Sequence, residues 1–189
     1  LQLDAALSGA GTLRVYGAKN VTSWNGIFGD NTNYFGKILL DGNGSTIETA
    51  GVQARVGNPL SFGGRLDEFR SDAVTITSYA MVKAVDDVVL TNDMNRGFYI
   101  ADNGGFNCDA GKTFETTWPV KLNGTLYKHG EGTLILGGAM THDTGSTGNF
   151  VVRGGTIGIL NDAAAAGLTV KATNDFTIAV LPGSTTVNG

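Results

Sequence analysis

Residues 126–138 read LYKHGEGTLILGG, and residues 148–157 read GNFVVRGGTI. Each stretch contains a short apolar run that ends at a pair of glycines. In the first run Leu134 and Leu136 fall on the same face of a strand, with the intervening residue on the other face. Short alternating runs bounded by glycine are typical of strands joined by tight turns. We therefore expect these residues to build a rung of β-structure and not a catalytic loop.

A second copy of the same pattern lies near the beginning of the chain. Residues 8–17, SGAGTLRVYG, align without gaps on the stretch that begins at His129. After a longer loop, residues 35–42, FGKILLDG, match residues 147–154. Two copies of one supersecondary unit predict a repeat architecture, in which each unit buries its apolar face on its neighbours.

The repeat copies span about 8–47 and 126–159, and we interpret residues 1–189 as a single β-solenoid segment. The fold class is all-β, and the predicted architecture is a parallel β-solenoid. A two-sheet antiparallel β-sandwich remains the alternative, because short strands at this spacing do not by themselves distinguish the two folds.

The central stretch resembles the passenger-associated repeat of bacterial autotransporters. In that repeat a leucine, a lysine and spaced glycines lead into Gly-Thr-Leu-x-Leu-x-Gly, and a polar loop and a Gly-Gly-Thr-Leu strand follow. The residues on this pattern are Leu126, Lys128, Gly130, Gly132, Thr133, Leu134, Leu136, Gly138, Gly148, Gly154, Gly155 and Thr156, with Ile157 in place of the last leucine. Residues 95–100, 110–113 and 119–120 resemble the lead-in of these passengers, so the resemblance covers roughly 95–160.

This resemblance implies a right-handed parallel β-helix that is secreted or displayed on the bacterial cell surface. It implies a structural and adhesive role without catalysis, in contact with host glycoprotein or with other cells. No cofactor is expected.

Composition limits the other classes of function. The net charge is −4 and charged residues make up 16% of the chain, which gives no electrostatic reason to expect a nucleic acid partner. No apolar stretch approaches the roughly 18 residues of a membrane span, so no membrane insertion is expected within this segment. The chain opens at Leu1 without methionine and ends within the strand pattern, so we expect it to be part of a longer protein.

Cys108 is the only cysteine, which excludes an internal disulfide and a zinc site built on paired thiols. We expect it to be a small apolar core residue. The most charged stretch, residues 65–72, is expected to be a solvated turn, and residues 161–167 give the one short helical signal.

Residues 21–34 form a predicted lateral loop that carries aromatic side chains. Among them, Trp24, Phe28 and Tyr34 are candidate ligand-binding residues for a glycan or a protein, because aromatic rings give large contact areas. The alternative is that these rings fold back over a rung as a small satellite core.

One tetrapeptide, which begins at Asp143, resembles a catalytic motif. Asp143, Thr144 and Gly145, followed by a serine, resemble the active-site loop of aspartic proteases, in which two carboxylates share one proton. The sequence contains the motif once, so a protease acting on extracellular glycoprotein such as mucin would need a second carboxylate, either within the chain or from a homodimer. The motif also coincides with the polar turn of the repeat, where these residue types are expected. His129 and His142 are expected to face solvent in loops and not to form a metal site.

Overall fold

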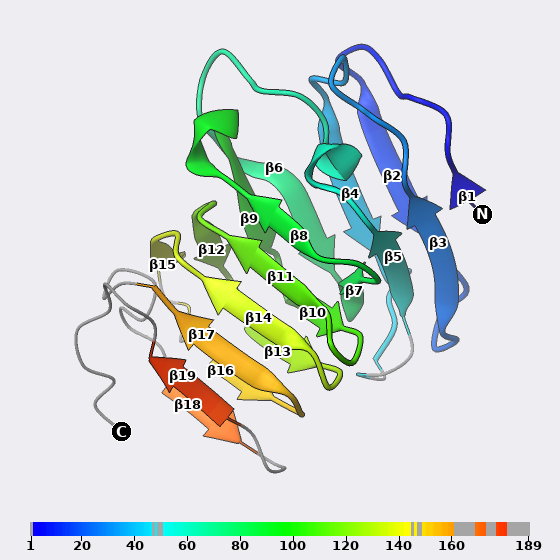
Figure 1. The fold of residues 1–189 in the computed structure, drawn as a ribbon. Helices are drawn as coiled ribbons and strands as arrows, with labels where there is room; N and C mark the ends of the chain where they lie inside the picture. The colour runs from blue at the N-terminus through cyan, green and yellow to red at the C-terminus, as the bar shows by residue number, and fades with distance from the viewer. Residues whose placement is uncertain are drawn as a thin grey trace.

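The computed structural model describes most of the chain. The described residues are 2–46, 48, 51–144, 146 and 149–160, with the backbone alone for 169–172 and 177–180. The strands stack as parallel coils that form a β-solenoid of about six turns, with almost no helix. β1 and β19 lie at opposite ends of the stack (Figure 1). The predicted helical turn at 161–167 lies outside the described residues.

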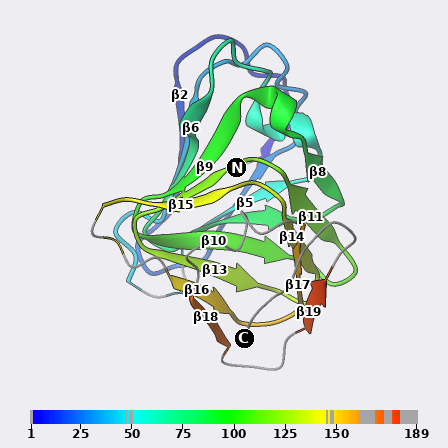
Figure 2. The same cartoon turned by 90° about the vertical axis from the view of Figure 1, so that its left-hand side faces the viewer.

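Three sheets form the walls of the solenoid (Figure 2). Sheet A contains, in spatial order, β1 (Gln2–Leu3), β3 (Ser23–Ile27), β5 (Val52–Val56), β7 (Ala80–Ala84), β10 (Asn103–Cys108), β13 (Thr125–His129), β16 (Asn149–Val152) and β18 (Thr169–Ala172). Sheet B contains β8 (Val88–Leu90), β11 (Thr113–Thr116), β14 (Thr133–Leu136), β17 (Thr156–Ile159) and β19 (Thr177–Val180). Sheet C contains β2 (Thr12–Tyr16), β4 (Lys37–Asp41), β6 (Arg70–Thr77), β9 (Arg96–Ile100), β12 (Val120–Leu122) and β15 (Met140–His142).

Every pairing between the described strands is parallel. The prediction of a parallel solenoid is therefore confirmed, and the antiparallel sandwich is excluded. From β7 to β17 the chain visits sheets A, B and C in turn. In the preceding turn the 3-10 helix η1 (Pro59–Phe62) stands between β5 and β6 and packs against β8, which has no partner strand on that side.

The core lies between the three sheets, and its side chains stack because the strands are in register. Val74, Phe98, Val120 and Met140 occupy one such row across sheet C, and all four are buried. Aromatic rings fill the centre, where the ring centroids of Phe62 and Phe98 lie 5.7 Å apart in an edge-to-face arrangement. This close packing of successive turns makes the solenoid a rigid support.

The sharp corner between sheets A and B depends on the repeat motif. Gly111, Gly130 and Gly155 have φ of +72°, +77° and +74°, a left-handed conformation that glycine adopts without steric cost. They stand at the same corner in three successive turns. The spaced glycines of the motif therefore allow the chain to turn sharply from sheet A into sheet B.

Lys128 occupies the interior of this corner, although lysine is rarely fully buried. Its ammonium lies 2.8 Å from the carbonyl oxygen of His129, 2.6 Å from that of Gly130 and 3.0 Å from that of Gly154. Three carbonyl acceptors replace the water that the ammonium loses on burial. The lysine of the motif thus joins two consecutive turns of the solenoid.

The two aligned sequence copies do not occupy equivalent walls. β2, from the first copy, lies in sheet C, whereas the matching strand β14 lies in sheet B. Likewise, β4 lies in sheet C and its match β16 lies in sheet A. The shared pattern therefore describes a strand, a turn and a strand, which the fold uses at more than one corner.

Candidate functional site

Asp143, the candidate catalytic residue, follows edge strand β15 and takes part in an ion pair. The Nζ of Lys121 lies 2.5 Å from Oδ1 of Asp143, and the Tyr99 hydroxyl donates a hydrogen bond of 2.8 Å to Oδ2. The hydrogen bonds from Lys121 and then from Tyr99 lower the pKa of Asp143. The carboxylate is held in its ionised form by an ammonium and a phenol.

The rest of the motif behaves as a turn. Thr144 lies in that turn, and the backbone N–H of Ser146 donates to the carbonyl oxygen of Asp143 at 2.9 Å. Gly145 lies outside the described residues. Shared-proton chemistry requires a second carboxylate that raises the pKa of one partner, and the groups that contact Asp143 here have the opposite effect.

The predicted lateral loop at 21–34 contains a strand, because β3 (Ser23–Ile27) pairs with both β1 and β5 in sheet A. The prediction of a loop was wrong for these five residues. Ser23, Asn25 and Gly26 have low β-propensity, but pairing on both sides of the strand outweighs it.

Tyr34, one of the three candidate ligand-binding aromatics, is buried in the core and only 5% exposed. Its hydroxyl accepts a hydrogen bond from the Leu13 N–H at 2.8 Å and lies 2.6 Å from the Gly11 carbonyl oxygen. Burial raises the pKa of the Tyr34 hydroxyl. Its ring is therefore part of the scaffold and is not available to a ligand.

Trp24 and Phe28, by contrast, are brought together on the outer face of sheet A. Trp24 is 51% exposed. Gly26 lies between them, and a Cβ atom built on it would lie 2.4 Å from the Phe28 ring, so this ring lies over the glycine. The Nζ of Lys83 sits 4.9 Å from the centroid of the Trp24 ring, a cation–π contact.

Polar side chains surround Trp24 on the neighbouring strands. Register places Gln53 beside Trp24 and Arg55 beside Gly26, and it places Lys83 beside Arg55 on the following strand of the sheet. The members of this surface, which we call the Trp24 face, are Trp24, Gln53, Arg55, Lys83 and Asn107.

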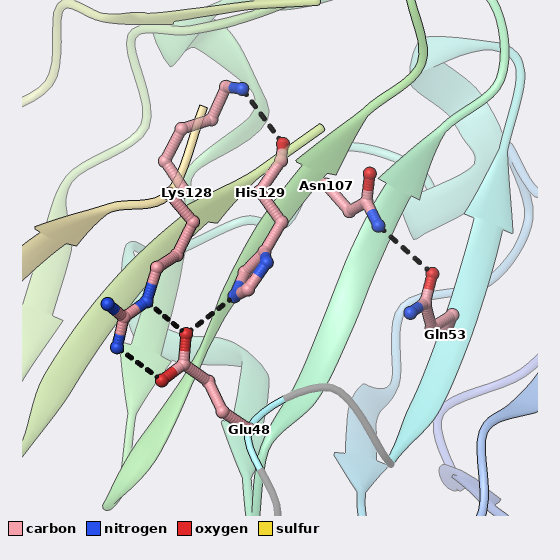
Figure 3. A network of polar contacts seen from close by, with 6 residues as sticks. Glu48, Gln53, Asn107, Lys128 and His129 are labelled. Atoms are coloured by element: carbon pink, nitrogen blue, oxygen red, sulfur yellow. Dashed lines mark hydrogen bonds and ion pairs between the residues drawn. The ribbon is translucent and has the colours of Figure 1, made fainter. Parts of the chain in front are cut away.

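Contacts with one another and with Asp109 hold three polar groups of the Trp24 face in place, those of Gln53, Asn107 and Lys83. Asn107 donates from Nδ2 to Oε1 of Gln53 at 3.2 Å (Figure 3), and Lys83 pairs with Asp109 at 2.6 Å. An exposed indole beside amides and a guanidinium is a surface suited to binding a polar ligand with flat apolar faces.

Farther along sheet A, Glu48 joins two strands. Its carboxylate accepts hydrogen bonds from Arg153 Nε at 2.5 Å and Arg153 Nη2 at 2.6 Å, and it lies 3.1 Å from His129 Nε2 (Figure 3). Burial is the main cause that lowers the pKa of His129. Sequence analysis did not find this cluster, because Glu48 and Arg153 are 105 positions apart.

The two histidines lie in strands and not in loops, which corrects the prediction from sequence. His129 ends β13 and His142 ends β15, and both side chains are half-buried. Within the described part of the chain, no group of three or more His, Cys, Asp or Glu side chains is arranged to hold a metal ion.

Comparisons with family models, with curated proteins and with solved structures find no match for this chain. Among the described residues, no helix has the length and hydrophobicity needed to cross a membrane.

Proposed function

We propose that this chain is a non-catalytic segment of a secreted or cell-surface protein of the autotransporter passenger type. It acts as a stiff scaffold and adheres to extracellular glycoprotein, mucin-type glycoprotein included, through the Trp24 face. The observation that carries the proposal is the half-exposed Trp24 ring, held on a flat sheet beside fixed amide and cationic groups.

The rigidity of the scaffold supports an adhesive role. In the described part of the chain sheet A continues through eight strands, and inward-facing apolar side chains fill the interior from β3 to β16. A surface that does not need to be ordered on binding loses little conformational entropy. A stacked solenoid can therefore present the same binding face at a distance from its attachment point.

The composition of the Trp24 face supports a glycan as the recognised part of the glycoprotein. The indole offers a flat apolar surface, while the half-buried Asn107 amide, which contacts the buried Gln53, offers a donor and an acceptor to hydroxyl groups. Arg55 is exposed on the same face and adds a fixed positive charge.

The alternative proposal is an aspartic-type protease that acts through Asp143. It requires a second copy of the chain to bring another carboxylate to Asp143, which here pairs with Lys121. We favour the adhesive function because the exposed groups of the Trp24 face are already placed to meet a ligand.

Binding to an immobilised mucin-type glycoprotein tests the adhesive function. The wild-type chain should bind, and Trp24→Ala should weaken binding at least about tenfold, as expected for loss of a central aromatic contact. Val89→Ala is the matched control, because Val89 is an exposed apolar residue on sheet B with 49% exposure.

Enzymatic removal of the glycans from the immobilised protein should abolish the binding. Equal binding by the wild type and Trp24→Ala, or wild-type binding that survives removal of the glycans, would contradict the proposal.

A further inference from the structure

A groove of about 590 Å³ lies away from the Trp24 face, between Phe35 and the segment 65–70. Two phenyl rings stand exposed in its wall, with Phe35 at 44% and Phe69 at 52% exposure. Isolated exposed aromatic residues are common on protein surfaces, but two in the lining of one groove mark a candidate ligand site.

Arg96 fixes the segments that line this groove. Its guanidinium is fully buried and donates hydrogen bonds to the carbonyl oxygens of Tyr34 at 2.8 Å, Gly36 at 3.2 Å and Gly64 at 2.8 Å. Tyr34 and Gly36 flank Phe35, and Gly64 directly precedes the segment 65–70. One buried side chain therefore sets the position of both walls of the groove.

Asn95 fixes the segment 65–70 from a second side. Its side-chain amide donates to the carbonyl oxygen of Leu66 at 2.7 Å, and its own carbonyl oxygen accepts from the Arg70 N–H at 3.0 Å. The Leu66 side chain is buried, which further holds the segment against the solenoid. The groove is thus preformed, so a ligand would not have to order its walls.

The charges of the groove cancel. Arg65 and Arg70 stand beside Asp67 and Glu68, and all four residues are exposed. A strongly charged ligand would be attracted by the two residues of opposite charge and repelled by the two residues of like charge. These groups suit a neutral ligand rich in hydroxyl groups, because guanidinium groups donate hydrogen bonds and carboxylates accept them.

The backbone of the groove disfavours an extended peptide. A peptide that adds to a sheet edge needs free N–H and carbonyl groups. Here the Phe35 N–H donates to the Gly9 carbonyl, the Leu66 N–H donates to the Met94 carbonyl, and the Leu66 carbonyl accepts from Asn95. These three backbone groups are therefore not available to pair with a peptide.

We propose that this groove is a second binding site, which takes a neutral oligosaccharide that stacks a sugar ring on Phe35 or Phe69 and hydrogen-bonds to the four charged side chains. The site is distinct from the Trp24 face and does not depend on the function proposed for that face.

Saturation-transfer NMR on the whole chain tests the site with three defined probes: lacto-N-neotetraose, maltohexaose and the sialylated form of lacto-N-neotetraose. At least one neutral probe should receive saturation, and Phe35→Ala, Phe69→Ala or both should reduce its affinity about tenfold. Val89→Ala, at an exposed position on sheet B outside both surfaces, should leave this binding unchanged. Unchanged thermal unfolding of the two phenylalanine variants would establish that they fold normally, as their exposure leads us to expect.

Three results would overturn the proposal. They are absence of binding to both neutral oligosaccharides, neutral binding that is insensitive to both phenylalanine substitutions, and a clear preference for the sialylated probe. Binding of a deglycosylated, unfolded polypeptide that is lost in Phe35→Ala, without binding of a neutral probe, would instead assign the groove to peptides.

Discussion

Glu48 and Arg153 form a two-point ion pair although they are 105 positions apart in the sequence, with Oε1 2.5 Å from Nε and Oε2 2.6 Å from Nη2. The guanidinium also lies 6.0 Å from the centroid of the Tyr127 ring. Tyr127 belongs to a small apolar cluster with Met81 and Val151 on the outer face of sheet A. The ion pair therefore ties a distant segment to this cluster.

We expect Glu48→Gln to lower the free energy of unfolding by about 1 kcal/mol, because a charge-assisted, two-point hydrogen bond becomes neutral. Urea denaturation followed by circular dichroism measures the change. Lys112→Gln, which removes the exposed ion pair of Lys112 with Asp86, is the control and should change the midpoint less. Equal effects of the two substitutions would show that the Glu48 contact is no stronger than an ordinary surface pair.

Lys128→Met should destabilise the fold by about 3 kcal/mol, because three buried carbonyl groups lose their donor. Urea denaturation of the folded variant gives the value. Lys19→Met, at an exposed turn, is the matched control and should leave stability nearly unchanged. A loss below about 1 kcal/mol would mean that other donors reach these carbonyls.

Cys108 should make stability fall at alkaline pH. Burial raises the pKa of its thiol from 9.0 to about 11. The folded state therefore retains the proton where the unfolded state loses it, so the stabilisation is complete below about pH 9 and is lost as the pH rises through about 11. Unfolding free energies measured across this range should fall less steeply for Cys108→Ala than for the wild type. Parallel curves would contradict the expected role of the thiol.

Asp143 should contribute stability at neutral pH that is lost in acid. Lys121 and Tyr99 lower the pKa of its carboxyl group, so its contribution is present above the unfolded pKa, about 3.9, and fades as the pH falls through the lower folded value. Asp143→Asn should remove this part of the acid dependence, as urea denaturation between about pH 2 and 7 can measure.

The same Asp143→Asn variant also tests the protease alternative. Incubation with a mucin-type glycoprotein between about pH 3 and 8 should give no cleavage with either protein. Cleavage at acid pH that disappears in the variant would establish a catalytic role for Asp143 and contradict a non-catalytic function.

The strands and turns of the solenoid could be predicted because their signals are local, and the repeated unit favoured stacking them as a solenoid. The glycines of the motif meet a backbone requirement, as the positive φ of Gly130 and Gly155 shows. The alternation of side chains in the short runs likewise reflects the two faces of each strand. These features depend on a few neighbouring residues and can be recognised without knowing what packs against them.

The surface could be predicted only in part, because it depends on contacts between turns. Trp24 and Phe28 were identified as candidates and share a face, but Tyr34 is buried because its hydroxyl finds acceptors in two other segments. The strand at Ser23–Ile27 forms because it has neighbours on both sides, and these are set by register across separate turns. Strand propensity did not reveal it.

Arg96 binds only main-chain oxygens, those of Tyr34, Gly36 and Gly64. These hydrogen bonds therefore do not depend on the side chains at the exposed positions of the two segments that line the groove. Substitutions at Phe35 or at 65–70 can exchange the chemistry of the groove while its framework stays intact. The same solenoid can thus acquire new ligands by surface mutation alone, and these exposed positions are the natural place to graft a designed binding motif.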